Sequence, residues 1–321
     1  MDTYVFLSAS ESRLDLILRE KIPVLTGVSV SNSKIRRLIF AGKVFVRGKV
    51  VRQPYFEVPP KAEITVEIEK EKLLLEKKAS DIDFAMTDKN LLYEDENIIA
   101  VNKPARFPCE QTFVEERNNL TKAVKEYLFQ KLKEKSPNIV NLPYLGIMHR
   151  LDKDTSGVIM FTKKREANGF YHNAFENHLI KKEYFAIVSP KNKSAEKWLL
   201  KKDFSVSFYM GRISAKSHSA KWGRVEQEKG GVYSKTNFHV EKQLSPDLYL
   251  IKCMLETGRT HQIRVHLSSL SLPILGDVLY GGKNAGRVML HSSKLTLPQI
   301  QEKSPLEIFA PFPDDFQTYI K

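Results

Sequence analysis

The chain has 321 residues and a formal net charge of +13, with a pI near 9.4. This length suggests two domains, and so large an excess of positive charge favours a polyanionic partner. No apolar run approaches the length of a membrane span, and the first residues do not have the pattern of a secretory signal. We therefore expect a cytoplasmic protein whose partner is a nucleic acid rather than a membrane.

The only two cysteines, Cys109 and Cys253, are far apart in the sequence. They make neither a disulfide framework nor the spacing of a metal site, which fits a reducing compartment. We expect both thiols to be small buried apolar side chains.

The N-terminal part predicts a small unit of two helices and three strands. The apolar spacing of residues 12–18 and 29–40 predicts two amphipathic helices. Residues 43–51 alternate around a central Arg-Gly pair and predict a hairpin, and residues 58–68 predict a closing strand.

This unit is strongly basic between residues 34 and 52, where no acidic residue occurs. Such a stretch predicts a face that contacts phosphates without reading sequence. The basic residues are Lys34, Arg36, Arg37, Lys43, Arg47, Lys49 and Arg52. A solvated basic surface is the alternative.

The stretches RLDLIL, SNSKIRRLI and GKVFVRGKVV together resemble the small αL RNA-binding domain. That domain occurs in a ribosomal small-subunit protein, in tyrosyl-tRNA synthetases and in several RNA-modifying enzymes. We assign it residues 1–75. The charge-rich stretch that follows predicts a linker over residues 76–88, with a second domain over residues 89–321.

The sequence of the second domain predicts both helices and strands. Its first apolar stretches predict a hairpin around residues 95–97, which ends at Pro104 and leaves Lys103 at the rim of the strand. Helices are predicted over 120–135, 164–179 and 260–269, the last capped by Thr260, and strands over 182–188, 236–241, 248–255 and 290–297, followed by a tail over 311–316.

One polar segment, HRLDKDTSG over residues 149–157, lies between two short apolar runs that predict strands. It holds Asp152 beside the basic residues Arg150 and Lys153. A carboxylate next to fixed positive charge stays ionised and suits a nucleophile. Taken alone, the segment is more typical of a solvated turn than of a catalytic site.

The order of five motifs resembles the RluA-type family of pseudouridine synthases. The motifs are VNKP, HRLDKDTSG, KEY, GRTHQIRVHL and GDVLYGG, spread over residues 90–297. The resemblance implies an α+β fold, in which the αL domain precedes a catalytic domain with a mixed, largely antiparallel sheet and flanking helices. It also implies an RNA uridine isomerase.

The resemblance further implies roles for individual residues. Asp152 would attack the target uridine at the ribose C1′ or at the base, and the detached uracil would rejoin through C5. Arg264 would pair with Asp152 in a bidentate manner, and Tyr184 would stack on the uracil and offer its hydroxyl near the C5 proton. Arg150 would replace the displaced uridine or contact its phosphates.

The RNA-binding residues expected besides Arg150 are Lys34, Arg36, Arg37, Lys43, Lys49 and Lys103. No metal, nucleotide or redox cofactor is expected, because the chain has no phosphate-binding glycine loop and no His/Cys cluster. His149, His261 and His266 have no further ligand at a sensible spacing.

Two other functions remain open for this sequence. One is a non-catalytic RNA-binding or ribosome-assembly protein of the same fold, and the other is a hydrolytic nucleosidase that releases uracil. The expected substrate is large-subunit ribosomal RNA, with transfer RNA as the rival, and the expected state is a monomer. Residues 105–112 and 189–235 depart from the family pattern, which leaves the choice of RNA open.

Overall fold

The computed structural model describes residues 2–27, 30–69, 82–110, 118–214, 220–300 and 304–321. These residues form two compact units, one ending at residue 69 and the other starting at residue 82. The first part of the predicted linker, residues 76–81, lies outside the described residues. Met86, which we placed in that linker, is buried in the core of the second unit, so this unit begins earlier than predicted.

The first unit packs two helices against a four-stranded sheet whose order is β1-β6-β3-β4. Strands β2 and β5 form a separate two-stranded antiparallel ladder, which ties the residues before α1 to those before β6. The elements are β1 (Asp2–Leu7), β2 (Ser12–Arg13), α1 (Leu14–Thr26), α2 (Asn32–Phe40), β3 (Val44–Val46), β4 (Lys49–Val50), β5 (Glu57–Val58) and β6 (Glu63–Ile68).

The predicted elements of this unit are present with different bounds. The first helix covers Leu14–Thr26 rather than residues 12–18, and the predicted strand over residues 58–68 is divided into β5 and β6. Leu14 and Leu18 of α1 and Ile35 and Ile39 of α2 are buried in one apolar core. Strands β3 and β4 form the hairpin around Arg47 and Gly48, whose φ angles of 50° and 74° are the positive values that a tight two-residue turn needs. The identity of this unit as an αL domain stays a prediction.

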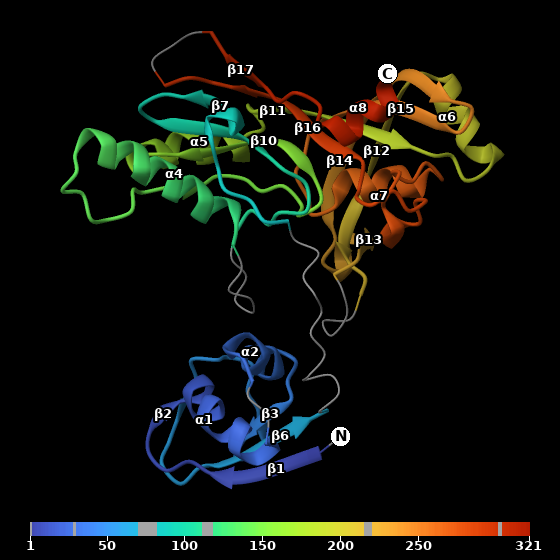
Figure 1. Cartoon of the computed structure of the whole chain (residues 1–321). Coiled ribbons are helices and arrows are strands. Elements are labelled where there is room, and N and C mark those ends of the chain that lie inside the picture. The colour runs from blue at the N-terminus through green and yellow to red at the C-terminus, as the bar shows by residue number, and fades with distance from the viewer. Residues whose placement is uncertain (1, 28–29, 70–81, 111–117, 215–219, 301–303) are drawn as a thin grey trace. The chain divides into compact units, whose positions relative to one another are not determined.

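The second unit is built on an 11-stranded sheet (Figure 1). Its main order is β13-β12-β14-β15-β11-β16-β10-β8-β7, with β17 paired to β16 and β9 paired to β10. The strands are β7 (Leu91–Glu94), β8 (Ile98–Lys103), β9 (Gly146–Ile147), β10 (Ser156–Thr162), β11 (Lys181–Val188), β12 (Asp203–Arg212), β13 (Trp222–Arg224), β14 (Val232–Ser245), β15 (Leu248–Leu255), β16 (Leu290–Leu297) and β17 (Leu306–Phe309). Only β10 and β16 pair in parallel among the strands described, so the prediction of a mixed, largely antiparallel sheet is confirmed.

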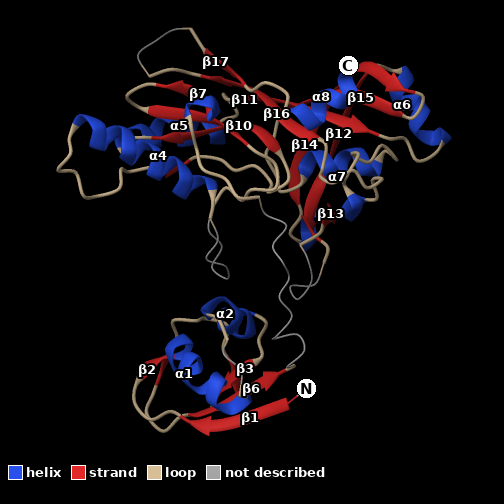
Figure 2. Cartoon of the chain, in the orientation of Figure 1, coloured by secondary structure: helices blue, strands red, loops and turns tan. Residues whose placement is uncertain are grey.

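Helices cover both faces of this sheet (Figure 2). Val158 and Met160 of β10 pack in one core with α5, while Ile159 and Phe161 point to the other face and pack in the core that contains α4 residues. The helices are α4 (Leu120–Lys135), α5 (Glu166–Glu176), α6 (Glu196–Leu200), α7 (Gln262–Ser269) and α8 (Asp314–Ile320). The expected tail therefore carries α8, and Phe316 of this helix is buried.

Leu132 of α4 and Phe170 of α5 are more than a third exposed, whereas Tyr171 and Ala174 of α5 are buried. Both helices lie at the surface of the sheet, and the buried stripe of each is narrower than the apolar residues of its sequence suggest.

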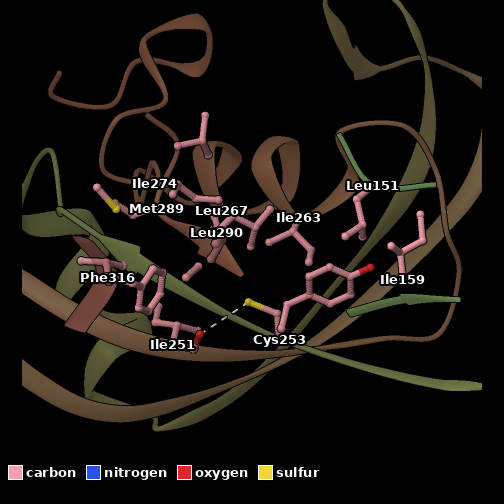
Figure 3. Close-up of a cluster of buried hydrophobic side chains, with 14 of the residues drawn as sticks. Leu151, Ile159, Ile251, Cys253, Ile263, Leu267, Ile274, Met289, Leu290 and Phe316 are labelled. Atoms are coloured by element: carbon pink, nitrogen blue, oxygen red, sulfur yellow. Dashed lines mark hydrogen bonds between the residues drawn. The ribbon is translucent and has the colours of Figure 1, made fainter. Parts of the chain in front are cut away.

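The larger core contains residues of helix α7 and of strands β8, β10 and β11, which carry or adjoin the motifs named above. Figure 3 shows Ile263 and Leu267 of this helix close to Cys253 and Ile251 of β15, with Leu151 and Ile159 beyond. Both cysteines are free and buried, as predicted. In the described part of the chain no helix is long and apolar enough to span a bilayer.

Gly157 allows a close approach between two strands. It lies at the start of β10 opposite Ser292 of β16, with a φ of 112°, and a Cβ placed there would lie 2.1 Å from the Ser292 carbonyl oxygen. Ser292 also pairs in register with Tyr184 of β11. Gly157 therefore allows β10, which follows the Asp152 segment, to pack closely on β16, the strand that lies between β10 and the Tyr184 strand β11.

We predict that Gly157→Ala lowers the stability of the second unit by about 3 kcal/mol or more, because the new methyl group meets backbone and the φ angle is unfavourable for alanine. Thermal unfolding followed by near-UV circular dichroism measures this loss as a lower midpoint. Gly169→Ala is the matched control, since Gly169 is inside α5 with open space around its Cβ position. That change is expected to raise stability by about 0.5–1 kcal/mol. Equal midpoints for the two variants would contradict this packing.

Candidate active site

Asp152 lies on the segment between β9 and β10, where Thr155 donates its N–H to the Asp152 carbonyl at 3.1 Å and closes a turn. The side chain is a quarter exposed, so the carboxylate is accessible from solvent at the edge of the core. The preceding residue, Leu151, is buried. Its carbonyl accepts from the Cys109 thiol at 3.2 Å and its N–H donates to the same sulfur at 3.4 Å, which anchors the backbone beside Asp152.

Lys103 is fully buried and does not lie at the rim of its strand, so the prediction that it binds RNA is wrong. Its ammonium donates to the carbonyls of Pro104, Lys153 and Thr155, at 2.8, 2.9 and 2.7 Å. Burial lowers the pKa of Lys103 to about 8. The proline does end the strand, but the side chain turns inward and ties the Asp152 segment to β8.

Arg264 projects from α7 towards Asp152, but its bidentate partner is another acid. Its Nε and Nη2 donate to the two carboxylate oxygens of Asp277 at 2.7 and 2.8 Å. Only Nη1 faces Asp152, 3.4 Å from Oδ2. The predicted pairing of Arg264 with Asp152 is therefore present as a single long contact, and the predicted bidentate geometry is wrong.

The position of Asp277 explains how a buried arginine is tolerated. The side chain of Asp277 is 1% exposed and that of Arg264 is 7% exposed. Burial lowers the pKa of Arg264, but the hydrogen bonds and charge of Asp277, with the charge of Asp152, raise it overall. Asp277 was missed in the sequence, although it stands in the GDVLYGG motif directly after Gly276.

Tyr184 lies on β11 and is buried beside Asp152. Burial raises the pKa of its phenol, a hydrogen bond with Ser292 lowers it in part, and the charge of Asp152 raises it further. The phenol is therefore neutral near pH 7 and is a weak general base. This disfavours the expected role of the hydroxyl in taking the C5 proton. The other expected role, stacking of the ring on the uracil, does not depend on the charge of the phenol.

His149 is part of the scaffold. Its Nε2 accepts the Met160 N–H at 3.0 Å, and its ring lies 4.9 Å from that of Phe175. Burial lowers the pKa of His149 to about 3, so the ring is neutral. His266 is bound separately, to Ser234 and Thr236.

Among the described histidines, His261 is the one that contacts this carboxylate, with Nε2 3.8 Å from Asp152 Oδ2. It also replaces Thr260 as the residue that precedes α7, so the predicted cap was one residue off. Among the described residues no group of three or more His, Cys, Asp or Glu is placed to hold a metal ion.

Arg150 lies at the surface next to Asp152. Its side chain is 64% exposed, and its Nη1 contacts Glu110 Oε1 at 2.6 Å. Glu110 belongs to the stretch 105–112 that departs from the family pattern. Contact between Arg150 and RNA stays a prediction.

The basic face of the first unit is less uniform than the sequence suggested, because acids from other elements reach it. Lys43 pairs with Glu67 of β6 at 2.8 Å, and Arg36 lies 3.9 Å from Asp15 of α1. Arg37 and Lys49 are exposed and Lys34 is half-buried.

The sequence reading missed an arginine and an aromatic ring beside this face. Arg13 binds Asp15 at 2.8 Å and lies over the exposed ring of Tyr55, with 4.4 Å between its Cζ and the ring centre. Arg36 approaches the same ring at 5.7 Å. A pocket in this unit is lined by Arg13, Asp15, Leu16, Arg19, Asn32, Ile35 and Arg36.

Comparisons with known proteins identify relatives of the chain. Residues 97–269 match a family model described as RNA pseudouridylate synthase. The chain is 31% identical over 301 residues to "Ribosomal large subunit pseudouridine synthase D" of Vibrio parahaemolyticus, covering 89% of this chain and 84% of that protein. It is 29% identical to "Ribosomal large subunit pseudouridine synthase C" of Buchnera aphidicola, covering 99% and 95%.

A solved structure shares the fold. "Human RNA Pseudouridylate Synthase Domain Containing 4" superposes with a TM-score of 0.57 at 21% identity, covering 72% of this chain and 92% of that one. At this identity the likeness supports the architecture of the second unit, including the mixed sheet that positions the site.

We predict that Asp277→Asn destabilises the second unit by about 3–5 kcal/mol, because it leaves the buried Arg264 without its counter-charge. Chemical unfolding of the wild type and the variant measures the loss. The double variant Arg264→Met/Asp277→Leu removes both charges and is expected to recover most of the stability, whereas RNA-modifying activity stays lost. An Asp277→Asn variant as stable as the wild type would contradict the assigned role of this pair.

Proposed function

This chain belongs to the RNA pseudouridylate synthase family, of the RluA type, and we propose that it acts on large-subunit ribosomal RNA with Asp152 as its nucleophile. As a member of the family it is an isomerase that converts uridine to pseudouridine in RNA. One observation carries the proposed role of Asp152. Its partly exposed carboxylate lies 3.4 Å from the buried, permanently charged guanidinium of Arg264.

The charges around Asp152 support a nucleophile. Arg264 is held by Asp277, so it presents one N–H to Asp152 and does not need to move during the reaction. This contact places a positive charge beside the carboxylate without covering both of its oxygens. An exposed carboxylate on a loose turn would lack such a fixed neighbour.

The proposed reaction conserves all atoms of the uridine. In the ribose route a carboxylate oxygen bonds to C1′ and the C1′–N1 bond breaks, so that the negative charge leaves with the uracil. The uracil turns, C5 bonds to C1′ as the ester bond breaks and the carboxylate is released, the C5 proton passes to a base, and N1 takes up a proton in its place. In the alternative route the carboxylate adds to the base first.

Tyr184 is proposed as the ring on which the uracil stacks during this turn. Burial raises the pKa of its phenol, which therefore stays neutral. Arg150 is proposed to contact the phosphates or to fill the space of the displaced uridine, since it is exposed beside Asp152. Extruding a paired uridine costs about a few kcal/mol, which phosphate contacts offset.

The choice of RNA rests on the relatives. Two relatives that span most of this chain are named for the large ribosomal subunit. We propose the same class of RNA for this chain, with transfer RNA as the rival, and a cytoplasmic monomer as the working form.

We predict that Asp152→Asn abolishes the modification, because an amide is not a nucleophile of useful strength here. Cells lacking the gene are supplied with the wild type or with a variant, and pseudouridines are mapped by carbodiimide treatment and primer extension. The wild type is expected to restore sites in large-subunit ribosomal RNA, and Asp152→Asn to restore none.

Asp154→Asn is the matched control for this experiment. It removes an equal charge two residues along the same turn and is expected to restore the sites. If Asp152→Asn restored the sites, the proposal that Asp152 is the nucleophile would be wrong. If the wild type restored sites only in transfer RNA, the proposed substrate would be wrong, but the proposed nucleophile would stand.

We also propose that Lys34, Arg36, Arg37, Lys43 and Lys49 of the first unit contact RNA phosphates. Their positive charge and the adjoining Arg13–Tyr55 pair support this role. Lys43 is the weakest candidate, since Glu67 already neutralises it.

We predict that the triple change Lys34→Gln/Arg37→Gln/Lys49→Gln weakens RNA binding at low salt. If each residue contacts a phosphate, the slope of log K against log salt becomes shallower by about 2, at about 0.7 for each lost contact to single-stranded RNA. Filter binding at a series of salt concentrations measures the slope. The charge-preserving variant Lys34→Arg/Arg37→Lys/Lys49→Arg should keep the wild-type slope, and an unchanged slope in the glutamine variant would remove these residues from the interface.

A further inference from the structure

His261 occupies an unusual backbone position beside the carboxylate. It precedes α7 with a φ of 58°, in the left-handed region that most side chains avoid. This conformation turns the ring towards Asp152, so that Nε2 lies 3.8 Å from Oδ2. Its side chain is 16% exposed, which places the ring in the wall of the site.

The other ring nitrogen of His261 is bound to Tyr280. The distance from Nδ1 to the Tyr280 hydroxyl oxygen is 2.9 Å. That same oxygen accepts the backbone N–H of Trp222 at 2.9 Å. Because the oxygen already receives one hydrogen from β13, its own hydrogen is available to Nδ1.

The charge states agree with this arrangement. Burial raises the pKa of the Tyr280 hydroxyl, so it keeps its hydrogen near pH 7. Burial lowers the pKa of His261 and outweighs the opposite effect of Asp152, so the ring is neutral. A neutral ring that accepts at Nδ1 carries its hydrogen on Nε2, the atom that faces a carboxylate oxygen, whereas the other tautomer would place two lone pairs against each other.

Both donors at Asp152 face the same oxygen. Arg264 Nη1 and His261 Nε2 each approach Oδ2, at 3.4 and 3.8 Å. Neither contact involves Oδ1. The two oxygens of this carboxylate are therefore not equivalent.

We propose that His261 is a positioning residue, held by Tyr280 as the Nε2–H tautomer, which with Arg264 binds Oδ2 of Asp152 and leaves Oδ1 to attack. The inference rests on the proposed role of Asp152 and adds the choice of oxygen. As Oδ1 bonds to carbon, the carboxylate charge passes to the uracil and Oδ2 becomes the ester carbonyl. The contact of 3.8 Å shortens when substrate enters, as hydrogen bonds at unoccupied sites commonly do.

This role gives a function to Trp222, which belongs to the stretch 189–235 that departs from the family pattern. Its backbone N–H, at the start of β13, donates to the Tyr280 hydroxyl and orients it. The chain of contacts runs from β13 through Tyr280 and His261 to Asp152.

Two substitutions at His261 distinguish the loss of the Nε2–H donor from a change in the backbone conformation. Asparagine suits the left-handed conformation but is too short to replace Nε2, whereas glutamine places an amide N–H close to that atom. Single-turnover tritium release from a large-subunit ribosomal RNA transcript labelled at uridine C5 measures the rate. We expect His261→Asn to slow the reaction by about 10–100-fold with RNA affinity changed less than about threefold, and His261→Gln to recover most of the rate.

His172→Asn is the control, because His172 is an exposed residue of α5, paired with Glu176 and remote from the reacting groups. It is expected to react at the wild-type rate. A normal rate for His261→Asn, or an equal loss in His261→Gln, would overturn the proposal.

Nitrogen-15 NMR of histidine-labelled full-length wild type tests the tautomer without a substitution at His261. The expected spectrum has a protonated Nε2 and a bare Nδ1, and Tyr280→Phe should mix the two tautomers. A protonated Nδ1 in the wild type would overturn the proposal. If Asp152→Asn itself remains active, the proposed function fails, whereas an inactive Asp152→Asn with a fully active His261→Asn defeats only this inference.

Discussion

A buried guanidinium between two carboxylates is the constraint on which the site depends. Arg264 cannot lose its charge, so burial demands a counter-charge and full hydrogen bonding. Asp277 supplies the counter-charge and accepts two of the five N–H groups through two short contacts. Nη1 is left to face Asp152. Asp152, the proposed nucleophile, thus receives a fixed positive neighbour, while the cost of burying that neighbour is offset by another residue.

The elements around this pair are arranged to hold it. The start of α7 is fastened by Gln262, whose side chain accepts from the Thr257 hydroxyl and the Arg259 N–H and donates to the Lys235 carbonyl. Tyr280 places its ring 5.0 Å from the Arg264 guanidinium carbon. On the opposite side Lys103 and Cys109 bind the backbone around Asp152. The buried polar side chains of Gln262, Lys103 and Cys109 therefore all help to position the Asp152 carboxylate or its neighbour Arg264.

Local patterns were enough to predict much of this fold. Helix α4 and strand β16 have the predicted bounds, and the hairpins around residues 47–48 and 95–97 are present, because apolar period and turn chemistry act over a few neighbouring residues. The partners of long side chains could not be read in the same way. Lys103 binds carbonyls about fifty residues away, and nothing near it in the sequence reveals whether its strand end is covered. Asp277 and Trp222 likewise matter only through contacts that the tertiary fold creates.

The central claim is that Asp152 attacks the uridine through the oxygen that Arg264 does not bind. A crystal structure of full-length Asp152→Asn bound to its RNA tests it most directly. The account predicts the target uridine extruded into the site, with C1′ or the attacked base carbon about 3–3.5 Å from the side-chain atom that replaces Oδ1 and with Arg264 and His261 on the other atom. A uridine whose reacting carbons face a different side chain would contradict it.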